Sequence, residues 1–300
     1  MNITLPDGSI KTFDHIVTAA DVAADIGAGL AKAAIGAKID GKLADLNQPI
    51  ENDAQLAIIT VPKKKQPIDQ QDPEALHLLR HSCAHVMAEA IQRLWPQTLL
   101  AYGPPLDNGF YYDISLDTPI SSDDFSRIED EMKKIIEEDR PFTRYELPND
   151  QGMERLNDEG NKYKIDNAQR AIDGGTAGLS WYVTGDQASQ AWEDLCMGPH
   201  VPSTGAIGAF KVMSIASSHW HGDVESDRFQ RVYGTAFFAQ ADLDNYLDRQ
   251  EQARQRDHRV IGQKLKLFTI DEQVGQGLIL WKPRGAMVRN LLQDFLQKEM

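Results

Sequence analysis

The chain has 300 residues, of which 41% are hydrophobic and 25% charged, with a formal net charge of −14. This length suits about two compact domains with sizeable cores, at roughly 150 residues each. The negative net charge argues against a protein that binds nucleic acid through a broadly basic surface, although local basic patches could still contact RNA. The two cysteines cannot form a disulfide framework, no apolar run reaches the ~20 residues of a membrane span, and the first residues lack a signal peptide. These features predict a cytoplasmic protein.

Residues 1–63 are predicted to form a small α+β domain. Segments rich in β-forming residues on both sides of Asp7-Gly8 predict a hairpin. A helix is expected through "TAADVAADIGAGLAKAA", with Thr18 as its N-cap, and short strands are expected in "GAKIDGKLADLNQPI" and "AQLAIITV". This order of two strands, a helix and two strands fits a β-grasp-like module. The polar segment 64–72 is interpreted as a linker.

A larger α+β domain is expected over residues 73–240. Asp72 as N-cap and Pro73 at the first helical position predict a helix that ends near Leu94. Further along, "SSDDFSRIEDEMKKIIEEDR" predicts an amphipathic helix whose charged residues form a solvated face.

Residues 241–300 are assigned to a connecting helix and the start of another domain. The charged, helix-prone stretch from about Ala239 to Leu265 predicts the connecting helix. The last stretch, "GLILWKPRGAMVRNLLQDFLQKEM", begins a new element and stops in the middle of a helix. We therefore expect the chain to be a fragment.

The first predicted helix of the larger domain carries His81 and His85, four residues apart. At 100° per residue, both lie opposite an apolar face that includes Cys83. Two readings remain open at this point: functional histidines, or polar residues exposed to solvent. Cys83, on the apolar face, is expected to be a buried small hydrophobe.

A second cluster lies in "WEDLCMGPHV", where Asp194 precedes Cys196 and His200. The Gly-Pro pair between the last two residues forbids a continuing helix and predicts a turn that projects side chains. Two histidines from the helix plus this Cys-His pair would satisfy tetrahedral zinc. They would equally form a hydrolytic pocket in which imidazoles move protons and orient water.

Three further segments contain candidate residues. Lys164 follows Tyr163, which we expect in a strand, and most lysines are simply solvated. Tyr111 and Tyr112 stand in "NGFYYDI", where core packing explains at least one of them. A base or ribose could stack or hydrogen-bond near a predicted strand in "SSHWHGDVESDRFQRVYGTAFF", which holds His219, Trp220, His221, Asp223 and Arg231.

These motifs, in this order, resemble the amino-terminal half of the bacterial threonyl-tRNA synthetase family. Residues 1–62 look like its TGS domain, and "RHSCAHVMAEAIQRLWP", "GPPLDNGFYYDI", "DLCMGPHVP" and "RVYGTAFF" look like its editing domain. "RDHRVIGQKLKLF" and "WKPRGAMVRNLLQDFL" are similar to its linker helix and to the first helix of its class II catalytic domain. Where the family commonly has Arg in "WRG", this chain has His221, which puts any contact of that arginine in doubt.

The resemblance implies proofreading, that is, hydrolysis of serine wrongly esterified to tRNA(Thr). A pocket rejects a smaller analogue by no more than ~1–3 kcal/mol, so serine errors require a second site that hydrolyses them.

The resemblance also implies that His81, His85, Cys196 and His200 line the editing pocket. Lys164 and Asp194 match its charged members, and Tyr112 matches an aromatic residue near the terminal adenosine. We expect one histidine, His81 for preference, to position or deprotonate the water or to work through the terminal ribose hydroxyl; the proton acceptor stays open among the three histidines and the RNA itself. Lys164 is expected to stabilise the oxyanion or help hold the water, and Asp194 to bind the seryl amine or hydroxyl. Cys196 is expected to shape the pocket rather than act as a nucleophile, and the pocket to work without metal.

The ligase core of the family would lie beyond residue 300. ATP, magnesium and zinc are implied for that missing aminoacylation domain, as is a homodimer for the full-length enzyme. As given, the chain should deacylate seryl-tRNA(Thr) but not activate threonine with ATP. Two alternatives remain: a non-catalytic, zinc-stabilised RNA-binding or regulatory module, and a free-standing deacylase that edits in trans.

Overall fold

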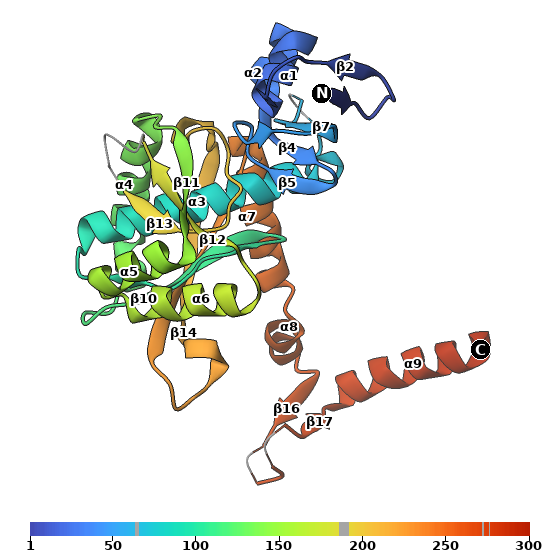
Figure 1. Cartoon of the computed structure of the whole chain (residues 1–300). Helices are drawn as coiled ribbons and strands as arrows, with labels where there is room; N and C mark the ends of the chain where they lie inside the picture. Colours follow the sequence, from blue (N-terminus) through green and yellow to red (C-terminus); the bar gives the residue numbers. More distant parts are fainter. Residues whose placement is uncertain (64–65, 186–191, 272, 276) are drawn as a thin grey trace. The chain divides into compact units, whose positions relative to one another are not determined.

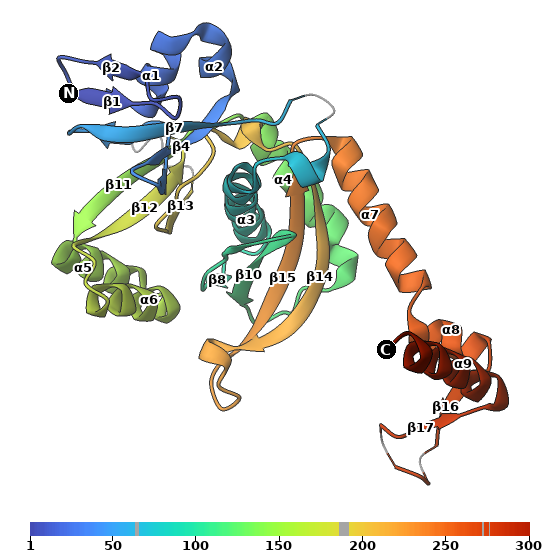
Figure 2. The same cartoon turned by 90° about the vertical axis from the view of Figure 1, so that its right-hand side faces the viewer.

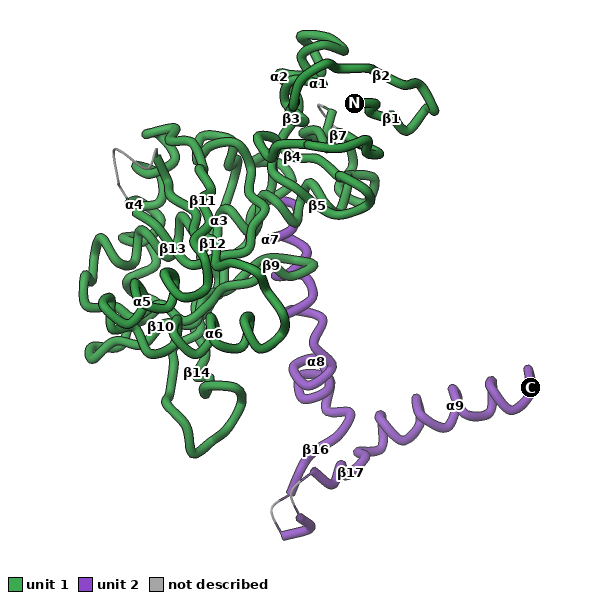
Figure 3. The backbone as a smooth tube through the Cα atoms, in the orientation of Figure 1, with its two compact units in different colours: residues 1–243 green, residues 244–300 purple. Residues whose placement is uncertain are grey.

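The computed structural model describes residues 1–63, 66–185, 192–271, 273–275 and 277–300. It divides into two compact units, residues 1–243 and 244–300 (Figure 3). The fold is α+β, as predicted, with a β-grasp part at the amino terminus followed by a larger α+β part. Residues 64 and 65 of the predicted linker lie outside the described residues.

The β-grasp part is a five-stranded sheet of order β2-β1-β7-β4-β5, in which β1 and β7 are parallel. Its elements are β1 (Asn2–Thr4), β2 (Ile10–Thr12), α1 (Ala19–Ile26), α2 (Ala28–Ala33), β4 (Ala34–Ile39), β5 (Lys42–Ala44) and β7 (Ala54–Thr60), with a small pair β3 (Val17–Thr18) and β6 (Pro49–Ile50). The hairpin and the Thr18 N-cap are confirmed, and Asp21 completes a capping box. The single predicted helix is wrong, because it breaks into two at Gly27.

The larger part is built around helix α3 (Pro73–Leu94), which Asp72 caps as predicted. On one side lies a sheet of order β14-β15-β10-β8, with β9 added to β10. Its strands are β8 (Leu99–Leu100), β9 (Pro105–Leu106), β10 (Gly109–Ser115), β14 (Ala209–His219) and β15 (Arg228–Phe237). The predicted amphipathic helix is confirmed as α4 (Phe125–Glu137), which buries Ile128, Met132 and Ile135.

On the other side of α3 lies a three-stranded antiparallel sheet (Figure 2). It consists of β11 (Phe142–Pro148), β12 (Gly178–Thr184) and β13 (Glu193–Leu195). Helices α5 (Asn149–Glu159) and α6 (Lys162–Asp173) connect β11 to β12. The strand expected at Tyr163 is wrong, because Asn161 accepts hydrogen bonds from the first amides of α6 and so begins a helix there.

Because α3 lies between two sheets, it is buried all round. All its residues from Ala75 to Ile91 are buried except His77. The exposed alternative for His81 and His85 is therefore wrong, and the helix has no solvated face on which they could lie. Cys83 is wholly buried, as expected.

The second unit continues α7 (Gln240–Gln255) and contains α8 (His258–Lys264), β16 (Phe268–Ile270), β17 (Ile279–Trp281) and α9 (Pro283–Glu299) (Figure 1). The single predicted connecting helix is wrong, because Asp257 accepts a hydrogen bond from the Arg259 amide and starts a new helix. Four short 3-10 turns complete the described elements, at Ile68–Gln70, Ser122–Asp124, Thr204–Ala206 and Trp220–Gly222. Among the described helices, none combines the length and the apolar character that crossing a bilayer demands.

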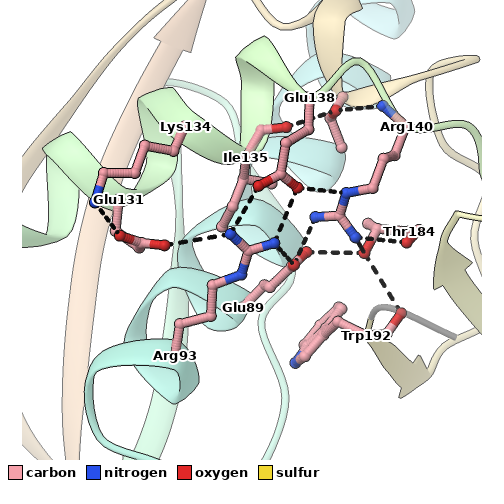
Figure 4. A network of polar contacts seen from close by, with 10 residues as sticks. Glu89, Arg93, Glu131, Lys134, Ile135, Glu138, Arg140, Thr184 and Trp192 are labelled. Carbon is pink, nitrogen blue, oxygen red and sulfur yellow. Dashed lines mark hydrogen bonds and ion pairs between the residues drawn. The ribbon is translucent and has the colours of Figure 1, made fainter.

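A buried ionic network joins α3 to the three-stranded sheet (Figure 4). Glu89, fully buried one turn after His85, accepts hydrogen bonds from Arg93 at 2.8 Å, Arg140 at 2.6 Å and Thr184 at 2.8 Å. Arg140 precedes β11 and Thr184 ends β12. This one carboxylate therefore fixes the distance between the histidine-bearing helix and the strands opposite it.

We expect Glu89→Ala to lower the free energy of unfolding by about 3–5 kcal/mol, because it removes the fully buried carboxylate that Arg93, Arg140 and Thr184 share and leaves Arg140 paired with Glu138 alone. Chemical denaturation measures this loss. The matched control is Asp130→Ala, which removes the same charge from an exposed pair with Lys133 and should leave stability nearly unchanged. Equal losses in the two variants would contradict a structural role for the network.

Candidate active site

The structure brings the two predicted histidine clusters together. The ligating atoms of His81, His85, Cys196 and His200 all lie within 4.8 Å of one another. The Cys196 thiol lies 3.3 Å from Nε2 of His81 and 3.6 Å from Nε2 of His200. Two imidazoles from α3 thus meet a thiol and an imidazole from the turn after β13.

Hydrogen bonds behind the rings decide which nitrogen of His81 and His200 carries the proton. Nδ1 of His81 lies 3.1 Å from the Pro199 carbonyl, which can only accept, so this nitrogen donates. Ser82 donates its one hydroxyl proton to the Leu78 carbonyl at 2.8 Å, so its 3.1 Å contact with Nδ1 of His200 is a bond donated by the imidazole. Both Nε2 atoms therefore direct a lone pair at the Cys196 thiol, which has only one proton.

Burial sets the charge state of this cluster. It lowers the pKa of His81 to about 4, and it lowers the pKa values of His85 and His200 well below the usual range, with the neighbouring imidazoles adding to the effect. Burial also raises the pKa of the Cys196 thiol to about 12. At neutral pH the three imidazoles are uncharged and can accept protons, whereas the thiol is protonated and a poor nucleophile.

A second, charged group of side chains lies beside the imidazoles. Lys164, in the first turn of α6, forms a 2.6 Å ion pair with Asp194 on β13, and both side chains are almost fully buried. Tyr112 on β10 donates its hydroxyl proton to the other oxygen of Asp194 and accepts a bond from Lys164 at 3.2 Å. Burial and the adjacent Asp194 carboxylate raise the pKa of Tyr112 well above its usual range.

Both groups open on one cavity of about 570 Å³, a size usual for small-molecule sites. Its lining includes six of the seven residues proposed from sequence: His81, His85, Tyr112, Lys164, Asp194 and Cys196. His200 lies behind Cys196 instead, stacked on Phe142 with 4.9 Å between ring centroids.

Several contributors were not proposed as site residues from the sequence. His77, Tyr102 and Arg144 also line the cavity. Ser82, which orients His200, lies inside the "HSCAH" motif. Its position directly after His81 was the one feature of the sequence that could have indicated a role in the site. Asp45 of the β-grasp part accepts a bond from the His200 amide, and nothing in the local sequence around it indicates this contact.

The other candidates do not line this cavity. Trp220 packs against a small core that contains Tyr163 and Phe229. The Tyr111 ring lies under the Arg231 guanidinium, 3.9 Å from the ring centroid. His221 forms a 2.7 Å contact with Asp166.

The four clustered donors also fit a zinc ion. A tetrahedron with a Zn–S bond of about 2.3 Å and Zn–N bonds of about 2.0–2.1 Å has S–N edges of about 3.5 Å, close to the separations around Cys196. His81 and His200 already donate their other ring protons to oxygens, as zinc ligands do. Four protein ligands would, however, fill a tetrahedral ion and leave no position for a reacting water.

Comparison with known proteins identifies two regions of the chain. Residues 1–60 match the TGS domain, and residues 179–233 match the threonyl and alanyl tRNA synthetase second additional domain. The second match contains Asp194, Cys196 and His200 but not α3.

Relatives match over the whole chain. The threonine–tRNA ligase of Citrifermentans bemidjiense is 43% identical over 299 residues, covering 100% of this chain and 44% of that protein. Those of Anoxybacillus flavithermus and Marinobacter nauticus are 43% and 42% identical over 99% of the chain, again with 44% of each relative covered. The chain thus spans less than half the length of these relatives. It corresponds to the amino-terminal region of threonine–tRNA ligases, comprising the TGS and editing domains.

Proposed function

We propose that this chain hydrolyses the ester between serine and tRNA(Thr), as the proofreading part of a threonine–tRNA ligase. The observation that carries the proposal is the shared cavity, in which uncharged imidazoles lie beside the buried Lys164–Asp194 pair. An ester hydrolase needs a base that is unprotonated at neutral pH and a cation for the developing oxyanion. His81 and Lys164 supply these two functions.

His81 can act as the base because His200 can accept the hydrogen bond from the Cys196 thiol. If the Cys196 S–H donates its hydrogen bond to Nε2 of His200, the Nε2 lone pair of His81 is available to accept a hydrogen bond from water. His81 takes a proton as the water attacks the seryl carbonyl carbon, and Lys164 stabilises the oxyanion. When the ester C–O bond breaks, the terminal ribose oxygen receives that proton, and serine and free tRNA leave.

The remaining polar residues of the cavity would recognise the substrate. Asp194 would bind the seryl amine or hydroxyl, and Tyr112 would lie near the terminal adenosine. His85 adds a further polar atom, because its Nδ1 is buried and has no hydrogen-bond partner among the described residues. Because His85 lines the cavity, a small rotation of its ring would bring this nitrogen within reach of the reacting water or a substrate hydroxyl.

Cys196 serves to shape the pocket in this proposal. Its raised pKa keeps the sulfur protonated, and an uncharged thiol attacks esters slowly. It bridges His81 and His200, so its removal changes their arrangement without removing the base.

The full-length protein would charge tRNA(Thr) with threonine, using ATP, in the cytoplasm, and would act as a homodimer. ATP, magnesium and a catalytic zinc would belong to its aminoacylation domain. A zinc ion held by all four donors of the present cluster would instead be structural, which is the alternative of a zinc-stabilised RNA-binding module. We keep hydrolysis without metal as the proposal, because a closed zinc site would remove both the base and the water position.

Purified chain should release serine from seryl-tRNA(Thr) and leave threonyl-tRNA(Thr) largely intact. His81→Ala should slow serine release by ~10²-fold or more, the range for loss of a general base. The matched control is His77→Ala, one turn earlier on the same helix and at the same cavity, which should cost far less. Similar rates for the two variants would remove His81 from the role of base.

Cys196→Ala should retain measurable deacylation, since the thiol is not the nucleophile. A chase with labelled seryl-tRNA detects any covalent intermediate. Complete loss of activity, together with an acyl-enzyme trapped in wild-type protein, would establish nucleophilic catalysis instead.

Metal content and chelation separate the hydrolase from the zinc-stabilised module. We expect elemental analysis to find well below one zinc per chain, and a chelator to leave both folding and serine release unchanged. One zinc per chain, with unfolding in chelator, would support the structural site.

A further inference from the structure

A carboxylate of the β-grasp part, that of Asp45, forms hydrogen bonds with the candidate site. Asp45 lies in the loop between β5 and β6, and one of its oxygens accepts the His200 amide proton at 2.8 Å. The other oxygen accepts the Tyr182 hydroxyl proton at 2.5 Å. Asp45 therefore holds a backbone group of the turn after β13 and a side chain of β12 together.

Tyr182 in turn supports the same turn. Its ring lies 4.4 Å from the His200 ring, centroid to centroid. A side chain at Gly198 would collide with the Tyr182 hydroxyl, so the turn rests directly on this ring. A shift of Tyr182 must move the segment that carries Cys196 and His200.

The His200 ring is held on several sides, since it also stacks on His81 and lies edge-on to His85. Ser82 accepts its Nδ1 proton, and Phe142 stacks on the ring face. Among the described residues, Asp45 is the hydrogen-bond partner of its backbone amide. In the proposed reaction His200 matters through Nε2, which accepts the hydrogen bond of the Cys196 thiol and leaves Nε2 of His81 available to water. The separation of 3.6 Å between Nε2 and Cys196 depends on where the backbone is held.

We propose that Asp45 is a positioning residue for the deacylation site, so that the TGS domain completes a site whose reacting groups all belong to the editing domain. The inference rests on the proposed function. Asp45 acts through His200 and Tyr182 and does not line the cavity that would receive the substrate.

A second contact between the same two parts provides a matched control. Lys38 on β4 forms a 2.6 Å ion pair with Glu74 at the start of α3, with about a third of each side chain exposed. It joins the TGS domain to the editing domain without touching Tyr182 or the turn after β13. A purely structural role for the domain contact would affect both variants alike.

The test compares Asp45→Ala, Asp45→Asn and Lys38→Ala in the full chain, with kcat and KM for serine release. Asp45→Ala should lower kcat by ~10-fold to 10²-fold with KM nearly unchanged, the scale expected when a catalytic group is misplaced by about 1 Å. Asp45→Asn should recover most of this loss, because its amide oxygen still accepts the His200 proton. Lys38→Ala should keep the wild-type kcat, even where its melting temperature falls.

Alkylation of Cys196 by iodoacetamide provides a readout that does not need activity, because the other cysteine, Cys83, is fully buried. Its rate should change in Asp45→Ala and stay at the wild-type value in Lys38→Ala. A wild-type kcat in Asp45→Ala, or an equal fall in Lys38→Ala, would overturn the inference. If wild-type protein releases no serine, the proposed function fails, and the alkylation rates alone decide whether Asp45 positions the turn.

Discussion

Helix α3 carries polar side chains through the middle of the protein, and a buried polar atom without a partner costs about 1–3 kcal/mol. The partners come from segments distant in sequence: Pro199 for His81, Val201 and His200 for Ser82, and Arg140 and Thr184 for Glu89. These bonds fix how α3 packs between the two sheets. The same bonds bring the turn after β13 to the histidines, so the fold and the site share one set of interactions.

The low polarity around α3 also determines the chemistry. Three imidazoles close together would repel one another if charged, and burial removes the water that would stabilise the charge. The cluster is therefore uncharged, while the Lys164–Asp194 pair keeps opposite charges in contact a short distance away. Uncharged bases beside a buried ion pair suit the proposed transfer of a proton from water to an ester oxygen.

Much of this architecture follows from local sequence. Asp72-Pro73 and Thr18 mark helix starts, and Asp7-Gly8 marks a hairpin. The spacing within "HSCAH" and "CMGPH" points to His81, His85 and Cys196 of the cavity lining. The errors have physical causes. A helical wheel cannot reveal a helix covered on both sides, and it cannot locate Gly27 or Asp257 as breaks. The contacts of Asp45 and Arg140 depend on tertiary packing, of which a single sequence contains no local pattern.

The hydroxyl of Ser82 has every bonding position occupied: it donates to Leu78 and accepts from His200 and Val201, in a position with no exposed surface. Alanine would leave the His200 Nδ1–H and the Val201 amide without a hydrogen-bond acceptor. Threonine would need space for a methyl group, and cysteine would form weaker and longer hydrogen bonds. Few substitutions of Ser82 should therefore be tolerated. Of the residues between His81 and His85, Ser82 is then the one with the fewest acceptable replacements.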